Sequence, residues 1–177
     1  MFDKPYRLKG IHSKKARELV AIFDGVSKAQ FFKAAKDVYA FAPLVGFLYN
    51  RRAELDHTKS EETGEELDYS IMAEQVLSVQ EDLTFNFCLI MLLDSMYEPD
   101  EEARIDKAFR HIGKIPEDEA RFDEYVRGGI DVLYEKLIEG GGAPEDYVKR
   151  LYDFAEDIQE RYNAEVDIDG LMKLCVG

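Results

Sequence analysis

The stretch that decides the fold is EDLTFNFCLIMLLDSMY, residues 81–97, the most apolar part of the chain. Its central run, Leu83 to Leu93, is interrupted by Thr84 and Asn86 and is too short for a membrane-spanning helix, which needs ~20 apolar residues. A second apolar run, Val38 to Tyr49, falls short of that length as well. We therefore expect residues 81–97 to form the central helix of a protein core, not a membrane span.

Outward from this helix, turn residues and the spacing of apolar residues delimit its neighbours. Glu98–Pro99–Asp100 ends the central helix, and apolar positions recur with a helical period on both sides of it. The predicted helices are residues 14–24 after Ser13, 28–49 after Ser27, 71–77 after Ser70, 81–97, 101–112, 116–139 and 145–162. The tail from residue 164 is interpreted either as a short strand at 166–168 or as a last helical turn.

The length and composition are those of one domain. With 177 residues and 46% hydrophobic residues, the chain can bury a core without disulfides or metal. We predict an all-α fold, a single-domain bundle of about six or seven helices over residues 1–177. Cys88 lies in an apolar run, and a disulfide with Cys175 is not expected. The polar start of the chain, with Pro5, does not resemble a signal peptide, so we expect a cytoplasmic protein with no membrane partner.

Three glycines and one proline lie inside predicted helices. Pro43 cannot donate a backbone hydrogen bond, so we expect the second helix to kink or restart there. Gly46 would allow a neighbour to approach closely. Gly128 and Gly129 each cost ~1 kcal/mol relative to alanine within a helix. That pair predicts a close helix crossing or a kink.

One segment lacks any apolar period. Residues 53–68 are polar and charged, with the run KSEETGEE at 59–66. This composition predicts a mobile polar loop within the domain.

Charge is unevenly distributed along the sequence. Residues 1–59 contain 12 Lys/Arg and 6 Asp/Glu, a net charge of +6. Residues 60–177 contain 11 Lys/Arg and 31 Asp/Glu, a net charge of −20, so the whole chain carries −14. A basic N-terminal third on an acidic chain indicates either an interaction surface or attraction between the two segments within the fold.

The basic third supplies the candidate binding residues. Nucleic-acid or partner contact requires cations clustered on one face, and several of these lie three residues apart on predicted helices. The candidates are Lys14, Lys15, Arg17, Lys28, Lys33, Lys36, Arg51 and Arg52. Another protein is the favoured partner, because the acidic remainder would repel DNA unless it faced away. DNA or RNA is the alternative partner, and the oligomeric state is left open.

No motif for catalysis, metal or cofactor binding is present. His12, His57 and His111 lie on separate segments without the spacing of a zinc site. Residues 165–170 resemble the start of a calcium loop, but its twelfth position is Val176 instead of a bidentate carboxylate. There is no nucleophile elbow and no phosphate-binding loop. We expect no cofactor and no metal, and lean towards a protein that is not an enzyme.

Two blocks of the sequence resemble a known family. They are KDVYAFA at 36–42 with Gly46–Phe47 and Arg51–Arg52, and FDEY at 122–125 with GGI at 128–130 and Leu133. Together they are similar to small bacterial proteins encoded beside DNA phosphorothioation (Dnd-type) modification and restriction genes, over residues 28–139 at most. The resemblance implies an accessory role in a DNA-modification or defence system and no catalytic residues. Pro43 departs from the small helix former expected at that position.

Three functional hypotheses follow. The first is a non-enzymatic accessory or protein-interaction component of a bacterial DNA-modification or defence system. The second is a nucleic-acid-binding module that uses the basic N-terminal helices. The third, an uncharacterised enzyme, requires a deep polar pocket lined by buried acids or histidine.

Overall fold

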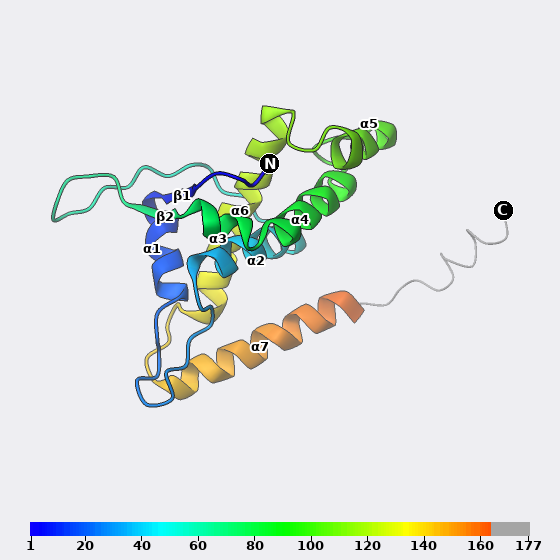
Figure 1. Cartoon of the computed structure of the whole chain (residues 1–177). Coiled ribbons are helices and arrows are strands. Elements are labelled where there is room, and N and C mark those ends of the chain that lie inside the picture. Colours follow the sequence, from blue (N-terminus) through cyan, green and yellow to red (C-terminus); the bar gives the residue numbers. More distant parts are fainter. Residues whose placement is uncertain (164–177) are drawn as a thin grey trace.

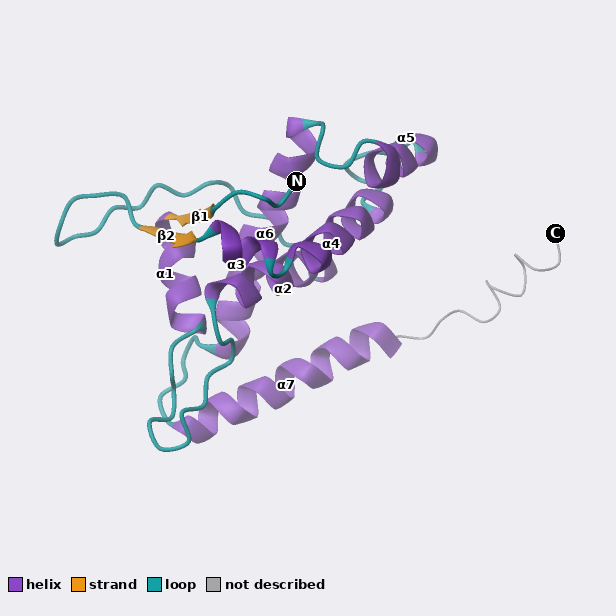
Figure 2. Cartoon of the chain, viewed as in Figure 1, coloured by secondary structure: helices purple, strands orange, loops and turns teal. Residues whose placement is uncertain are grey.

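The computed structural model describes residues 1–163, and these form a mainly helical fold with one small sheet (Figures 1 and 2). Its elements are β1 (Tyr6–Lys9), α1 (Gly10–Leu19), α2 (Ala35–Leu48), β2 (Asp68–Ile71), α3 (Ala73–Leu77), α4 (Gln80–Leu93), α5 (Glu101–Ile105) with a π-helical turn η1 (Asp106–Arg110), α6 (Pro116–Leu137) and α7 (Pro144–Asn163). The mainly helical class is confirmed, but the prediction of a purely all-α fold is wrong. The expectations for the tail, for residues 165–170 and for Cys175 fall outside the described residues.

The sheet pairs the start of the chain with the segment before α3. β1 and β2 are antiparallel, with Tyr6 opposite Ile71 and Lys9 opposite Asp68. Leu8 and Ile71 are almost completely buried beneath it, which explains why so short a pair forms. Ser70 is therefore a strand residue and not the helix cap that the sequence suggested.

α1 begins and ends earlier than its predicted range, 14–24. It starts at Gly10, directly after β1. Its first turn is capped by a residue remote in sequence, because the Ile11 amide donates to Asp56 Oδ1 at 2.5 Å. Ser13 is buried inside the helix, where its hydroxyl donates to the Gly10 carbonyl at 2.8 Å. The expected cap at Ser13 is wrong because a carboxylate from the loop between α2 and β2 already fills that role.

α2 begins later than predicted, at Ala35. Residues 20–34 form an irregular connection, in which Ser27 bonds to Asp24 instead of capping a helix. Asp37 holds the first turn, since its carboxylate accepts from the Ala34 amide at 2.9 Å. α2 then runs through the buried Pro43 without interruption, so the expected restart is wrong.

The centre of the fold is a close crossing of α2 and α6. A Cβ atom added to Gly129 would lie 1.8 Å from the Ala42 carbonyl oxygen, and one added to Gly46 would lie 2.2 Å from the Tyr125 carbonyl oxygen. Gly128 similarly faces the Arg51 carbonyl oxygen at 2.1 Å. Gly46 and Gly129 therefore let the backbones of α2 and α6 touch, and Gly128 lets the segment after α2 approach α6. Of the two predictions for Gly128 and Gly129, a close crossing or a kink, the structure has the close crossing.

α4 packs one face into the core. Leu83, Phe87, Ile90 and Met91 are completely buried, and the side-chain amide of Asn86 donates to the Ala40 carbonyl on α2 at 2.7 Å. The N-terminal segment closes this side of the core: Phe2 packs at 5.5 Å from Phe122 and at 6.4 Å from Phe87, measured between ring centroids. Among the described residues, no helix has the length and apolar character needed to cross a bilayer.

α7 is a peripheral helix that crosses below α4 in Figure 1. Phe154 is buried against Tyr49, and Asp157 accepts hydrogen bonds from the Tyr49 hydroxyl at 2.6 Å and from Lys136 Nζ at 2.8 Å. These contacts attach it to the end of α2 and to α6.

The loop between α2 and β2 extends away from the helices (Figure 1). An isolated bridge between Lys59 and Glu66 closes its outer part, and residues 61–66 are all exposed. The predicted polar loop is therefore present over the expected segment, while its mobility stays a prediction.

Candidate functional site

Three of the predicted basic residues lie against acids of α6. Lys15 Nζ contacts Asp131 Oδ1 at 2.6 Å. Arg51 and Arg52 pair with Glu135 and Glu124 at 3.1 and 3.3 Å. The three cations belong to the basic N-terminal third, and their partners belong to the acidic remainder of the chain. These ion pairs therefore neutralise part of the charge asymmetry within the fold.

Two more of these residues are engaged with neighbouring elements. Arg17 donates to the Asp68 carbonyl at 2.8 Å and stacks over the Tyr69 ring at 4.5 Å. Lys36 donates to the Ser78 hydroxyl at 2.8 Å. Arg17 therefore contacts β2 and Lys36 contacts the residue after α3, whereas Lys15, Arg51 and Arg52 contact α6.

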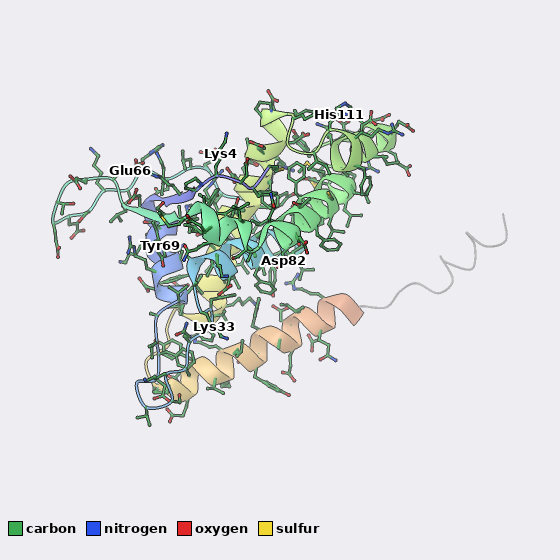
Figure 3. All side chains as sticks on the ribbon, in the orientation of Figure 1. Lys4, Lys33, Glu66, Tyr69, Asp82 and His111 are labelled. Atoms are coloured by element: carbon green, nitrogen blue, oxygen red, sulfur yellow. The ribbon has the colours of Figure 1, made fainter. Side chains whose placement is uncertain are left out.

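The other three candidates, Lys14, Lys28 and Lys33, are exposed and have no ion pair with any described residue. Lys14 lies on α1, and the other two lie on the connection between α1 and α2. Figure 3 shows Lys33 well apart from Lys4, another exposed cation of the basic third. The structure therefore distributes the eight candidates over several elements.

A feature that the charge analysis missed is an exposed apolar stripe on α4. Phe85, Leu93 and Met96 are 64%, 53% and 76% exposed, and Leu89 and Leu92 between them are partly buried. Residues four apart share one helix face, so Phe85, Leu89 and Leu93 form a row along α4 beside Leu92, and Met96 lies in the turn just after the helix. We call these five residues the α4 stripe. The sequence signal was available, because the helix is apolar on all sides while only one face can be buried.

Acidic side chains flank the α4 stripe at both ends. Glu81 and Asp82 are exposed in the first turn of α4, and Asp82 is labelled in Figure 3. Asp100, Glu101 and Glu102 are exposed just after the other end. The surface is thus apolar in the middle and negative at its edges.

A cavity of about 410 Å³ lies between the N-terminal segment and α6. Its walls include Phe2, Tyr6, Tyr39 and Phe122, and the Asp123 carboxyl group lies among them. The rings of Tyr6 and Tyr39 are stacked with centroids 4.0 Å apart, and the Tyr6 hydroxyl donates to Asp123 Oδ1 at 3.1 Å. No Ser, Cys or His lines this cavity, so its described walls do not supply the usual nucleophile and base pair.

Burial changes the acidity of the groups in this cavity. It raises the pKa of Asp123 to about 6, against the opposing effects of the Arg127 guanidinium and the Tyr6 hydroxyl. Burial and the nearby Asp123 charge also hold the pKa values of Tyr6 and Tyr39 well above the usual range of tyrosine. Both phenols are therefore neutral at physiological pH, whereas Asp123 is mostly ionised.

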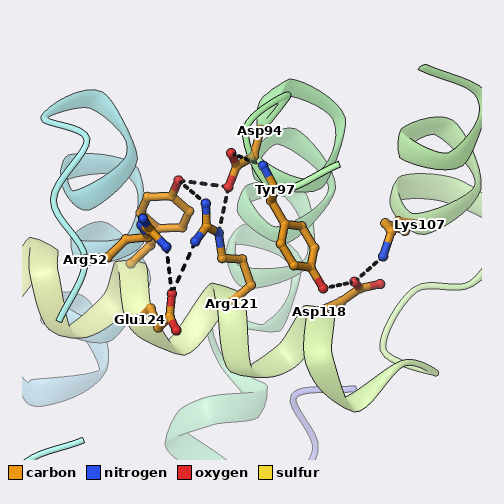
Figure 4. A network of polar contacts seen from close by, with 8 residues as sticks. Arg52, Asp94, Tyr97, Lys107, Asp118, Arg121 and Glu124 are labelled. Atoms are coloured by element: carbon orange, nitrogen blue, oxygen red, sulfur yellow. Dashed lines mark hydrogen bonds and ion pairs between the residues drawn. The ribbon is translucent and has the colours of Figure 1, made fainter. Parts of the chain in front are cut away.

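A buried polar network joins the end of α4 to α6 (Figure 4). Asp94 Oδ2 accepts hydrogen bonds from Arg121 Nε and from the Tyr125 hydroxyl, each at 2.8 Å. Arg121 also contacts Glu124 at 3.4 Å, and Glu124 in turn pairs with Arg52. Asp94 and Arg121 are almost fully buried, so this pair is protected from solvent screening.

A second buried acid lies beside this network. Asp118 is completely buried, and its Oδ1 accepts from Lys107 Nζ and from the Tyr97 hydroxyl, each at 2.7 Å (Figure 4). Its Oδ2 has no hydrogen-bond partner among the described residues. These contacts tie η1 and the segment after α4 to the first turn of α6.

The histidines do not converge. His12 is buried with Nε2 3.4 Å from Asp131 Oδ1, His57 contacts Glu66 on the outer loop, and His111 is exposed (Figure 3). Nowhere in residues 1–163 do three potential metal-ligating side chains gather.

Neither a protein-family model, nor a curated protein, nor a solved structure matches this chain.

Proposed function

We propose that this protein is a non-enzymatic interaction protein that docks another protein on the α4 stripe. The exposure of Phe85 and Leu93 on one face of α4, with Met96 exposed just after the helix, is the observation that carries the proposal. A row of large apolar side chains in water is unfavourable unless a partner covers it, and such patches mark interaction sites. Aromatic residues and methionine are also enriched in protein interfaces.

The charges around the α4 stripe indicate the chemistry of the partner. Acids flank both ends of the stripe, and the whole chain carries −14. A basic amphipathic helix would place its apolar face on the stripe and its cations beside these acids, the helix-in-groove mode of recognition. We therefore propose a partner segment of that kind.

The sequence resemblance supports the cellular context of this proposal. It favours an accessory component of a bacterial DNA-modification or defence system. The two blocks that carry the resemblance lie on α2 and α6 and include Gly46, Gly128 and Gly129, whose close approach forms the centre of the fold. The similarity thus lies in the packing core and not in a set of catalytic side chains.

Affinity purification from the source organism tests the proposal. The bait is the full chain, compared with a double variant, Phe85→Glu with Leu93→Glu, that places charges on the stripe. The matched control is Val148→Glu, because Val148 is 60% exposed on α7, away from the stripe. We expect a protein captured by the wild type and the control but lost with the double variant, and identified as a modification or restriction component. Capture that is unaffected by the double variant contradicts docking on α4.

A synthetic peptide separates apolar docking from charge attraction. The probe is a helical leucine–lysine peptide, and its control has the same composition in an order that cannot form an apolar helix face. The double variant is more negative than the wild type, so binding by charge alone would strengthen. Docking on the α4 stripe instead predicts binding weakened at least about tenfold.

A further inference from the structure

The cavity between the N-terminal segment and α6 contains a carboxylate that lacks a counter-ion. Asp123 is partly buried, and other buried or partly buried acids have a counter-ion: Asp94 pairs with Arg121, Asp118 with Lys107, and Asp131 with Lys15. Asp123 accepts only the neutral Tyr6 hydroxyl, and no described cation lies within ion-pair distance of it. Even partial burial of a carboxylate without a cation is unfavourable.

The nearest positive side chains are directed elsewhere or exposed. Arg127 favours the ionised form of Asp123 from a distance, but it makes no ion pair with it, and its Nε donates to the Ala53 carbonyl at 2.8 Å. Lys4 also lines the cavity, yet it is exposed and has no carboxylate of the described residues within 4.0 Å. The position in front of Asp123 is therefore not filled by a cation of the described chain.

The shape and the walls of the cavity define what could fill that position. Its volume of about 410 Å³ lies within the usual range of small-molecule sites, about 300–1,000 Å³. The partly exposed ring of Phe2 offers apolar surface, beside the Tyr6 ring at the same wall, and aromatic faces attract cations. The lining contains three acidic side chains, Asp3, Glu119 and Asp123, and two positive groups, the Lys4 side chain and the amino group of Met1.

We propose that this cavity binds an organic ammonium ion, with its charged nitrogen against the Asp123 carboxylate and its apolar body against Phe2 and Tyr6. The ligand forms a charge-assisted hydrogen bond to Asp123 and replaces the water that this carboxylate loses on burial. This site is separate from the α4 stripe and does not depend on the docking function proposed above.

Binding of a matched pair of small molecules to the full chain tests the site. The probes are 2-phenylethylamine and its neutral analogue 2-phenylethanol, followed by isothermal titration calorimetry and by NMR shifts of the α6 amides. We expect the amine to bind at least about tenfold more tightly than the alcohol. Equal binding of the two, or no binding of either at millimolar concentration, overturns the proposal.

Two variants with opposite expected effects on amine binding test whether the amine binds in this cavity. Asp123→Asn keeps the shape of the side chain and should weaken amine binding at least about tenfold while leaving alcohol binding unchanged. Lys4→Met removes the only lysine in the lining and should strengthen amine binding. Glu117→Gln is the control, because Glu117 is exposed on the same helix and does not line the cavity. An Asp123→Asn protein that folds and binds the amine as the wild type does also overturns the proposal.

The ammonium group can come from a free amine or from a lysine side chain of a partner protein. Lysine blocked at its amino and carboxyl ends distinguishes these sources. If 2-phenylethylamine and the blocked lysine both bind in a manner that depends on Asp123, the site accepts lysine side chains. If only 2-phenylethylamine binds, the ligand is a free amine. Each of these results supports the cation site, and failure of the α4 stripe variants would leave it unaffected.

Discussion

The Asp123 carboxyl group makes a specific contribution to the pH dependence of stability. Burial raises its folded-state pKa to about 6, above the value of about 3.9 in an unfolded chain. Between these values the folded state binds the proton and the unfolded state does not. Asp123 therefore lowers the free energy of unfolding as pH rises from about 4 to about 6, and the loss reaches at most about 3 kcal/mol above that window.

Asp123→Asn isolates this contribution, because the amide is neutral at every pH. We expect the variant to unfold at higher urea concentration than the wild type at neutral pH, with the difference disappearing below about pH 4. Urea denaturation at a series of pH values measures it. A difference that is independent of pH would mean that Asp123 is solvated in the folded state.

Arg121 illustrates the opposite situation, a buried charge with its partner in place. Arg121→Ala leaves Asp94 buried without a cation, and we expect a loss of about 3–5 kcal/mol in the free energy of unfolding. Combining it with Asp94→Leu should recover a large part of that loss, because both charges are then gone. A double variant as unstable as Arg121→Ala would show that packing by the guanidinium, and not charge pairing, is what matters.

Among the elements, the α2–α6 crossing is the least tolerant of change. Gly129→Ala places a methyl group into the Ala42 carbonyl, and the two helices must separate to accept it. We expect this to reduce the free energy of unfolding by about 3 kcal/mol or more, which exceeds the ~1 kcal/mol that alanine gains in helix propensity. Gly25→Ala is the control, because no atom lies within 4 Å of its added Cβ. Equal stability of the two variants in urea contradicts the close crossing.

Helices that depend on local signals could be predicted from the sequence, and those that depend on distant contacts could not. α6 starts at the predicted Pro116, and its apolar period is regular. α1 is misplaced because it begins where β1 ends, and both the strand pairing and the Asp56 cap come from segments remote in sequence. Ser13, Ser27 and Ser70 matched the pattern of a helix cap. In the structure Ser13 lies inside α1, Ser27 bonds to Asp24, and Ser70 lies in β2.

The same reasoning explains why the candidate sites were only partly predicted. The basic residues were found by counting charges, but their partners on α6 became visible only when the helices were packed together. Asp118 and Arg121 occupy positions that continue the buried stripe of Phe122 and Tyr125, which is a recognisable signal of buried charges, but their partners Lys107 and Asp94 lie on other segments. Asp123 lies beside that stripe, and its cavity depends on the position of the N-terminal segment.

For the whole molecule, the distribution of charge argues against nucleic-acid binding. Three of the eight predicted binding residues are paired with acids and two more are engaged, while the net charge is −14. We expect no mobility shift of duplex DNA or single-stranded RNA in a gel assay at low salt, conditions that favour even non-specific complexes. A shift that weakens with added salt and is lost on combining Lys14→Glu with Lys33→Glu would instead support the basic surface.

The outer part of the loop before β2 is a suitable site for inserting a tag or a reporter. Its backbone contacts near the tip are local, from the Ser60 amide to the Glu65 carbonyl and from the Gly64 amide to the Ser60 carbonyl, and no atom lies near the Cα of Gly64 on its open side. A peptide tag or fluorescent reporter inserted between Glu62 and Thr63 would interrupt only these local bonds, so the rest of the fold should accommodate the graft. The loop is therefore the natural place to attach a probe while both chain ends stay in their native form.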